Sequence, residues 1–379
     1  MADREAELTA RLAPGISAIH PLAWDRLAGS DPFLSHAFLA ALESSGSVGP
    51  GTGWSPAPLI IEDQSGYLVA AAPAYLKSHS QGEYVFDHGW AEAYDRAGGQ
   101  YYPKLLVAVP FTPVPGPRLL GRFPQQLLGT AESVVVQNGL SSAHINFIDD
   151  AGAAECERRG WLIRHGVQYH WLNRGYGDFD EFLAGLASRK RKAIRKERAA
   201  ARDGLEFAAL RGSAIGPSEW DALWAFYQDT GSRKWGRPYL TRDFFDRIGE
   251  TMGDRLLLFL AYRDGRPIAG ALNLVGPDTL YGRYWGAIEE VRFLHFELSY
   301  YQAIEWAITH HLGSVQAGAQ GEHKLARGYQ PVISRSAHFL ADRGLRQAVA
   351  TFLDEERRAI ATEAEWEREA LPYRSSSSE

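Results

Sequence analysis

The feature that most constrains the fold is an approximate internal repeat. Residues 66–72 read Gly-Tyr-Leu-Val-Ala-Ala-Ala, and residues 265–271 read Gly-Arg-Pro-Ile-Ala-Gly-Ala. A turn pair precedes each copy, and an aromatic strand is expected after each, at residues 83–86 and 280–285. Such units predict an antiparallel meander. A spacing of about 200 residues, half of the chain, indicates duplicated domains rather than a solenoid. The alternative is a chance match, because hairpins with small residues are common.

The chain is long enough for two domains of ordinary size. It has 379 residues, of which 45% are hydrophobic, so two cores can be buried. We expect the halves to meet near residue 165. This gives domains at residues 1–165 and 166–370, followed by a mobile tail at 371–379.

Charge and cysteine content exclude several classes of protein. The formal net charge of −6 argues against a surface made wholly for nucleic acid, although a local basic patch is compatible with it. Cys156 is the single cysteine, so an internal disulfide and a cysteine-based zinc site are excluded and a reducing cytoplasm is expected. Residues 1–13 have no apolar core of a signal peptide, and no window of about 18 apolar residues predicts a membrane span.

Helices and strands alternate along both halves. Residues 102–118 are rich in proline and predict a rigid loop or a sheet edge. Apolar spacing and caps predict helices at residues 21–28, 35–44, 123–138, 218–230, 244–252, 297–312 and 344–366. A further helix is predicted to begin at Asp178 or Asp180 and to run on to Ile194, with Phe182, Leu183, Leu186 and Ile194 on one side. Further strands are predicted at residues 144–148, 170–173, 255–262 and 315–317.

Several segments resemble a known family. The segments at 188–197, 226–230, 233–240, 265–271 and 281–285 resemble the GNAT-type acyltransferase module of Fem-like enzymes. More narrowly, Gly-Ala-Gln-Gly-Glu-His-Lys-Leu-Ala-Arg-Gly-Tyr at 318–329, Gly-Gln-Tyr-Tyr-Pro-Lys at 99–104 and Val-Pro-Phe-Thr-Pro at 109–113 are similar to the FemAB-like family of peptidoglycan biosynthesis or recognition. The resemblance covers about residues 16 to 365. It implies the α/β (α+β) class with two tandem GNAT-like domains, each a mixed, mostly antiparallel sheet flanked by helices.

The resemblance also implies a function. The chain would be an N-acyltransferase that moves an acyl or aminoacyl group from acyl-CoA or aminoacyl-tRNA to the amine of a small molecule or peptide, such as a cell-wall precursor. No tightly bound cofactor and no metal are expected. A GNAT holds the donor pyrophosphate in a glycine-containing turn, but residues 290–297 contain no glycine, which weakens coenzyme A as the donor. The alternative class is a non-catalytic, degenerate GNAT module that binds a cell-wall fragment or nucleic acid.

Three residues are the candidates for catalysis. Acyl transfer to an amine needs a proton acceptor, stabilisation of an oxyanion and a proton for the leaving group. Glu322 and His323 lie in a short glycine-flanked segment after a strand, and His323 titrates near neutral pH. Glu297 lies at the start of a helix, where the helix dipole alone favours a carboxylate. We expect all three to border one cleft with Tyr284, although a solvated turn would also explain Glu322 and His323.

The remaining candidates would bind substrate or phosphate. The candidate substrate-binding residues are Lys324, Arg327, Arg283, Tyr284, Tyr300, Arg96, Tyr102 and Lys104. Surface salt bridges or core packing are the alternatives for these side chains. Arg189, Lys190, Arg191 and Lys192 open a strongly basic helix that predicts contacts to the phosphates of tRNA or of a lipid pyrophosphate. A solvated charged face is the simpler reading of that helix.

Overall fold

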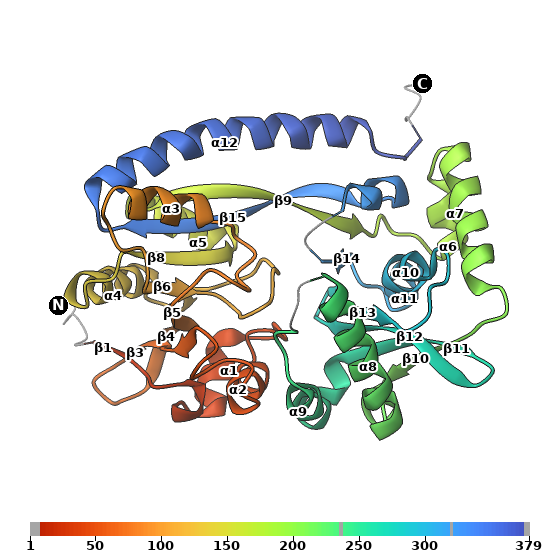
Figure 1. Ribbon diagram of the computed structural model, residues 1–379, viewed down its shortest axis with the longest axis horizontal. Coiled ribbons are helices and arrows are strands. Elements are labelled where there is room, and N and C mark those ends of the chain that lie inside the picture. The colour runs from red at the N-terminus through yellow and green to blue at the C-terminus, as the bar shows by residue number, and fades with distance from the viewer. Residues whose placement is uncertain (1–7, 235–237, 319–320, 375–379) are drawn as a thin grey trace, which may run out of the picture. The chain divides into compact units, whose positions relative to one another are not determined.

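The computed structural model describes residues 8–234, 238–318 and 321–374. Two compact units form the chain: unit 1 comprises residues 1–166 and 333–362, and unit 2 comprises residues 167–332 and 363–379. The chain passes between the units within β9 (Leu162–Leu172), β15 (Gln330–Leu340) and α12 (Arg343–Glu369). Each unit is a mixed α/β structure whose strands are mostly antiparallel (Figure 1), so the predicted fold class is confirmed.

Residues 333–362 pack with unit 1, whereas the sequence placed them in the second domain. The reason is pairing across a long stretch of sequence. Residues 335–340 of β15 pair antiparallel with β8 (Ser142–Ile148). The first turns of α12 then bury Leu345, Val349 and Leu353 in a core cluster of unit 1.

Unit 1 contains two sheets. The smaller has the antiparallel order β1-β3-β4-β7, and the larger has the order β15-β8-β6-β5-β2, in which only β6 and β8 run parallel. Helix α4 packs on β3, β4, β6 and β8. The elements are β1 (Thr9–Leu12), α1 (Pro21–Ala28), α2 (His36–Ser44), β2 (Trp54–Pro56), β3 (Leu59–Glu62), β4 (Leu68–Ala72), β5 (Ala74–Lys77), α3 (His88–Arg96), β6 (Lys104–Val107), β7 (Leu120–Gly121), α4 (Pro124–Gln137), β8 and α5 (Asp150–Arg158), with the 3-10 turn η1 (Ile16–Ala18).

Unit 2 contains one sheet in the order β10-β11-β12-β13-β14, followed by the part of β9 that belongs to it. Only β13 and β14 run parallel. Helix α8 covers one face at β12 and β13, and α11 contacts β13, β14 and α6. The elements are α6 (Phe179–Ala184), α7 (Ser188–Arg202), β10 (Glu206–Arg211), η2 (Gly212–Ala214), α8 (Pro217–Lys234), α9 (Arg242–Met252), η3 (Gly253–Arg255), β11 (Leu256–Arg263), β12 (Arg266–Val275), β13 (Thr279–Ala287), α10 (Leu294–Phe296), the π-helix η4 (Glu297–Tyr301), α11 (Gln302–Thr309), β14 (Ser314–Ala317) and the 3-10 helix η5 (Glu322–Arg327).

Three local expectations were wrong. Residues 83–86 form no strand but lie in an irregular segment, where Tyr84 has a φ of 58°. The helix that begins after Asp178 ends at Ala184, and α7 is a separate helix. Residues 371–374, predicted to be mobile, are held by Tyr373, whose hydroxyl donates to Gly328 O at 2.6 Å; residues 375–379 lie outside the described residues. In the described part of the chain, no helix is long and apolar enough to cross a membrane.

Candidate active site

The sheet of unit 2 opens between its two parallel strands. β13 pairs with β14 from Thr279↔Ser314 to Gly282↔Ala317, but β13 continues to Ala287. A bulge lies at the point where the pairing ends, because Leu272 faces Tyr284 while Asn273 faces Gly282, which leaves Arg283 as the extra residue. Residues 283–287 therefore extend beyond their partner strand on this side.

The two faces of this extension differ. Tyr284 is 9% exposed and contacts the rings of Tyr227 and Phe245, at 5.8 Å and 5.5 Å between centroids. These rings belong to α8 and α9. Trp285 has its ring 5.1 Å from that of His295, at the start of the helix that follows. The expected cleft therefore has Trp285, and not Tyr284, on the side of this helix.

The helix that follows β13 has an irregular start. Phe293 is its N-cap, with a left-handed φ of 65° and no capping side chain. The turns of η4 are π-helical, and such turns occur frequently at functional sites. As the sequence indicated, no glycine turn for a pyrophosphate lies before this helix.

His323 joins an aromatic cluster at this helix. Its Nε2 lies 2.8 Å from the Tyr300 hydroxyl, and its ring lies 5.5 Å from that of Phe296 and 6.3 Å from that of His295. The ring of Tyr300 stacks on that of Phe296 at 5.8 Å. Burial raises the pKa of Tyr300, so its hydroxyl stays protonated at neutral pH. The structure therefore brings together His323 and Tyr300, and adds Trp285, His295 and Phe296, which are not among the predicted catalytic or substrate-binding residues.

Gly321 makes the position of His323 possible. It has a φ of 124°, and a Cβ at this position would lie 2.5 Å from Cε1 of the His323 ring. Lys324, the next residue of η5, is 1% exposed and donates from Nζ to Gly318 O at 2.6 Å. Burial lowers the pKa of Lys324 to about 7, so part of the population carries a neutral amine near pH 7. The backbone of Glu322 begins η5, and its side chain lies outside the described residues, as do residues 319–320.

Arg327 is engaged within the protein rather than open to a substrate. Its guanidinium donates to Tyr301 Oη at 2.9 Å, to His323 O at 2.7 Å and to Glu197 Oε2 at 2.8 Å. It also lies 3.5 Å from the centre of the Phe296 ring. Arg327 therefore connects η5 to α7 and to the helix that carries Tyr300.

Glu297 contacts the basic helix α7, and its carboxylate is bound by two arginines of that helix. It is fully buried and accepts two hydrogen bonds of 3.0 Å from Arg198 and one of 2.8 Å from Arg202. Arg198 also pairs with Glu305 at 2.6 Å. The expected convergence of Glu297 and His323 on one cleft is therefore not seen. The sequence contained a signal for this arrangement. Arg198 and Arg202 are four residues apart, so they lie on the same face of α7 and can bind one carboxylate together.

The four basic residues at the start of α7 differ from those that follow. Lys190 and Arg191 are half-buried, whereas Arg189 and Lys192 are exposed. Arg195 pairs with Asp180 at 2.9 Å, but within the described ranges no carboxylate lies at ion-pair distance from residues 189–192. The start of α7 is thus an unneutralised basic surface.

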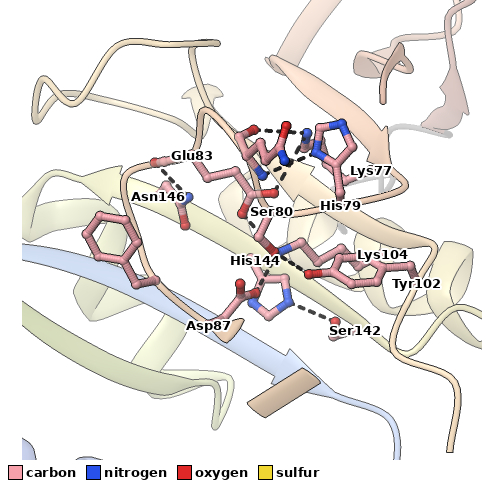
Figure 2. A network of polar contacts seen from close by, with 12 residues as sticks. Lys77, His79, Ser80, Glu83, Asp87, Tyr102, Lys104, Ser142, His144 and Asn146 are labelled. Carbon is pink, nitrogen blue, oxygen red and sulfur yellow. Dashed lines mark hydrogen bonds and ion pairs between the residues drawn. The ribbon is translucent and has the colours of Figure 1, made fainter. Parts of the chain in front are cut away.

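The predicted residues of unit 1 have different positions. Arg96 is exposed at the end of α3, and Tyr102 is half-buried, with its hydroxyl 2.8 Å from Ser80 Oγ. Lys104 is fully buried and donates to Ser80 Oγ at 2.7 Å and to Glu83 Oε2 at 2.8 Å (Figure 2). Lys104 and Tyr102 therefore belong to one polar network, and among the described contacts of this network none involves Arg96.

Among the described residues, no group of three His, Cys, Asp or Glu is placed to hold a metal ion. A surface hollow of about 680 Å³ in unit 2 is lined by residues of α8, α9, η2 and η3 and contains none of the predicted site residues. The aromatic cluster around His323 lies outside the lining of this hollow.

The comparisons with known proteins place the sequence and the fold. Residues 15–375 match the model of the FemAB-like family, described as peptidoglycan biosynthesis or recognition. The fold is similar to that of FemX, with 12% identity and a TM-score of 0.53 over 91% of this chain and all of that one. Two further matches are the C-terminal domain of a putative lysylphosphatidylglycerol synthetase from Agrobacterium fabrum (12% identity, TM-score 0.49, 86% and 93% covered) and a tandem GNAT protein from the clavulanic acid pathway (13% identity, TM-score 0.46, 89% and 99% covered). No curated protein matches the sequence.

Proposed function

Because the chain belongs to the FemAB-like family of GNAT-related proteins, we propose that it is an N-acyltransferase that moves an acyl or aminoacyl group to an amine. The observation that supports this most directly is the pair of His323 Nε2 and Tyr300 Oη, 2.8 Å apart. This pair joins a ring cluster that includes Trp285, on the part of β13 that extends beyond its pairing with β14. A proton acceptor, a protonated hydroxyl and open strand backbone are the groups that acyl transfer needs.

The roles follow from protonation states. His323 accepts the proton of the attacking amine. As the bond from the acyl carbon to the leaving oxygen or sulfur breaks, the Tyr300 hydroxyl, which burial keeps protonated, gives its proton to that atom and takes up the proton held by His323. Lys324 is the second candidate base, because its pKa of about 7 leaves a neutral amine available. Glu297 positions the helix through α7 and takes no part in proton transfer.

The donor in this proposal is aminoacyl-tRNA or acyl-CoA, and the acceptor is the amine of a small molecule or peptide such as a cell-wall precursor. The missing glycine turn before Leu294 disfavours the pyrophosphate of coenzyme A. The unneutralised start of α7, residues 189–192, favours a polyanionic donor such as tRNA. The substrate-binding side chains proposed in unit 2 are Lys324, Arg283 and Tyr300.

A non-catalytic module is the second candidate function. The observation that favours it is the internal engagement of Arg327 and Glu297, which leaves fewer charged groups for a substrate. The two candidate functions differ in one measurable property: only an acyltransferase would convert the donor and the amine into product.

The test is a turnover assay with acyl-CoAs and aminoacyl-tRNAs as donors and a panel of peptide amines as acceptors. His323→Ala should lower turnover by about two to four orders of magnitude, with the thermal midpoint unchanged, because His323 is exposed. Lys324→Met tests the second base in the same assay. A stable His323→Ala protein with full activity would remove His323 from the mechanism, and no turnover with any donor would favour the binding module.

A further inference from the structure

Two buried lysines face each other on adjacent strands of unit 1. The antiparallel register of β5 and β6 pairs Lys77 directly with Lys104, and both side chains are fully buried. Directly opposed residues share one face of a sheet, and like charges in such a pair are destabilising. The position therefore requires anions that are brought in by another segment.

The chain supplies these anions from the irregular segment 78–87, between β5 and α3. Lys104 Nζ donates to Glu83 Oε2 at 2.8 Å and to Asp87 Oδ2. Figure 2 shows both carboxylates directed at the lysine ammonium groups. Burial would lower the pKa of Lys104, but the carboxylates of Glu83 and Asp87 raise it, so that Lys104 stays charged.

The carboxylates of Glu83 and Asp87 do not satisfy all the polar groups around the two lysines. Glu83 Oε1 lies 3.9 Å from Lys77 Nζ, too far for a hydrogen bond, and neither it nor Asp87 Oδ1 has a partner in the described part of the chain. Lys77 Nζ instead donates to the carbonyls of Gly53 and Gln81 at 3.2 Å and 3.4 Å. Trp54 lies under the same ammonium, 3.8 Å from it, and its buried Nε1 has no described acceptor. Two carboxylate oxygens and one N–H donor are therefore left without hydrogen-bond partners among the described residues around the lysine pair.

We propose that Lys77 and Lys104 form an anion-binding site that segment 78–87 occupies in this structure, and that a phosphate- or carboxylate-bearing ligand binds there by displacing Glu83 and Asp87. The ligand would gain the two ammonium groups, the Trp54 indole N–H and the hydroxyls of Ser80 and Tyr102, which already lie at Lys104.

The covering segment is suited to such an exchange. It contains no helix or strand, and Gly82 and Tyr84 have left-handed φ angles of 78° and 58°. For a bulky residue such as Tyr84 this conformation is strained. The ion pairs of Glu83 and Asp87 hold the strained segment in place, and a competing anion would release it.

The experiment removes the negative charges of Glu83 and Asp87, which compete with a ligand for the two lysines. In the double variant Glu83→Gln/Asp87→Asn, inorganic pyrophosphate should bind about tenfold tighter or more than to the unaltered chain, by calorimetry at constant ionic strength. Adding Lys77→Met to the double variant should reverse the gain. Glutarate in a parallel titration distinguishes a carboxylate ligand from a phosphate ligand.

A folded double variant that binds neither anion more tightly would overturn the proposal and leave a structural ion pair. If the double variant does not fold, hydrogen exchange of the unaltered chain decides. Millimolar pyrophosphate or glutarate should then accelerate exchange in residues 78–87, and unchanged exchange with both anions would overturn the proposal. Neither readout depends on acyl transfer, so the failure of one proposal leaves the other standing.

Discussion

Glu297 accepts three hydrogen bonds from two arginines in a position without solvent exposure, and this decides what its loss would do. Glu297→Gln keeps the shape but removes the charge, which leaves Arg198 and Arg202 without their shared partner. Breaking a buried ion pair from one side costs about 3–5 kcal/mol, and the lower end is expected because the Arg202 side chain is 45% exposed. Urea unfolding measures this loss.

Glu305 offers a matched control for Glu297. Its carboxylate accepts from the same Arg198, but its side chain is 46% exposed. Glu305→Gln should therefore cost less than about 1 kcal/mol. A Glu297→Gln protein of full stability that had lost turnover would restore Glu297 as a catalytic residue and contradict the positioning role.

The surroundings of His323 and Glu297 show which contacts could be predicted from the sequence and which could not. His323 and Lys324 could be selected because titratable side chains between glycines form a local pattern. The partners of Glu297 lie about 100 positions earlier in the chain, and burial at that range cannot be read from a local pattern. The same reason explains Lys104, which was predicted to meet substrate but meets Glu83 and Asp87.

At the scale of elements, the two ends of α7 differ in their charge partners. Arg198 and Arg202 bind Glu297, whereas residues 189–192 have no carboxylate within ion-pair distance in the described ranges. Changing these four residues to Gln should weaken tRNA binding and lower the slope of log K against log salt by up to about four phosphate contacts. Filter binding at several salt concentrations measures both quantities.

A charge-matched control for the α7 experiment is available in the same unit. Arg242, Arg247, Arg263 and Arg266 each pair with a described carboxylate, so their replacement removes the same net charge from neutralised positions. An equal loss of affinity in both variants would show that α7 acts only through net charge.

Elements defined by local signals were predicted well. Pro21–Ala28 has the predicted bounds, and Ser35 caps α2 by accepting from Phe38 N. The aromatic run at 83–86 has strand propensity, yet the buried lysines draw Glu83 inward and the segment stays irregular. β15 was not predicted, because its alternating serines and His338 are buried polar residues that satisfy one another and neighbouring groups.

At the scale of the whole molecule, three elements (β9, β15 and α12) contribute residues to both units. The internal repeat in the sequence does not coincide with the boundaries between the units. The hairpin at 66–72 forms β4 of the small sheet, whereas its counterpart forms β12 in the main sheet of unit 2. The parallel pairs β6–β8 and β13–β14, each flanked by antiparallel strands, are the clearer common feature of the two units. This pairing depends on contacts distant in sequence, so the repeat predicted two related halves without predicting their boundaries.

Unit 1 contains buried acids and bases that respond to acid in opposite directions. Burial lowers the pKa of His144 to about 3 and that of His338 well below its usual range, and the two Nδ1 atoms lie 2.7 Å apart. Below about pH 6.5 the unfolded chain therefore binds more protons at these imidazoles, and stability falls. Burial raises the pKa of Glu43 and Glu83 to about 7, so between about pH 7 and 4.5 the folded unit binds more protons at the carboxyls and stability rises.

These opposing effects predict the shape of the stability curve of unit 1. Between about pH 6.5 and 4.5 the two histidines and the two glutamates nearly offset each other. Below about pH 4.5 the carboxyls of Glu43 and Glu83 are protonated in both states, and the two imidazoles should lower the free energy of unfolding by about 2.7 kcal/mol per pH unit. Burial opposes a lowered pKa at Asp87, but the Lys104 ammonium outweighs it, so Asp87 adds to this loss only below about pH 3.8. Urea unfolding from pH 7 to 3.5 measures this curve, and His338→Gln should reduce the slope below pH 4.5 by about half. A steep loss of stability that already begins at pH 6.5, or an unchanged slope in His338→Gln, would show that the His144–His338 pair does not control the response of unit 1 to acid.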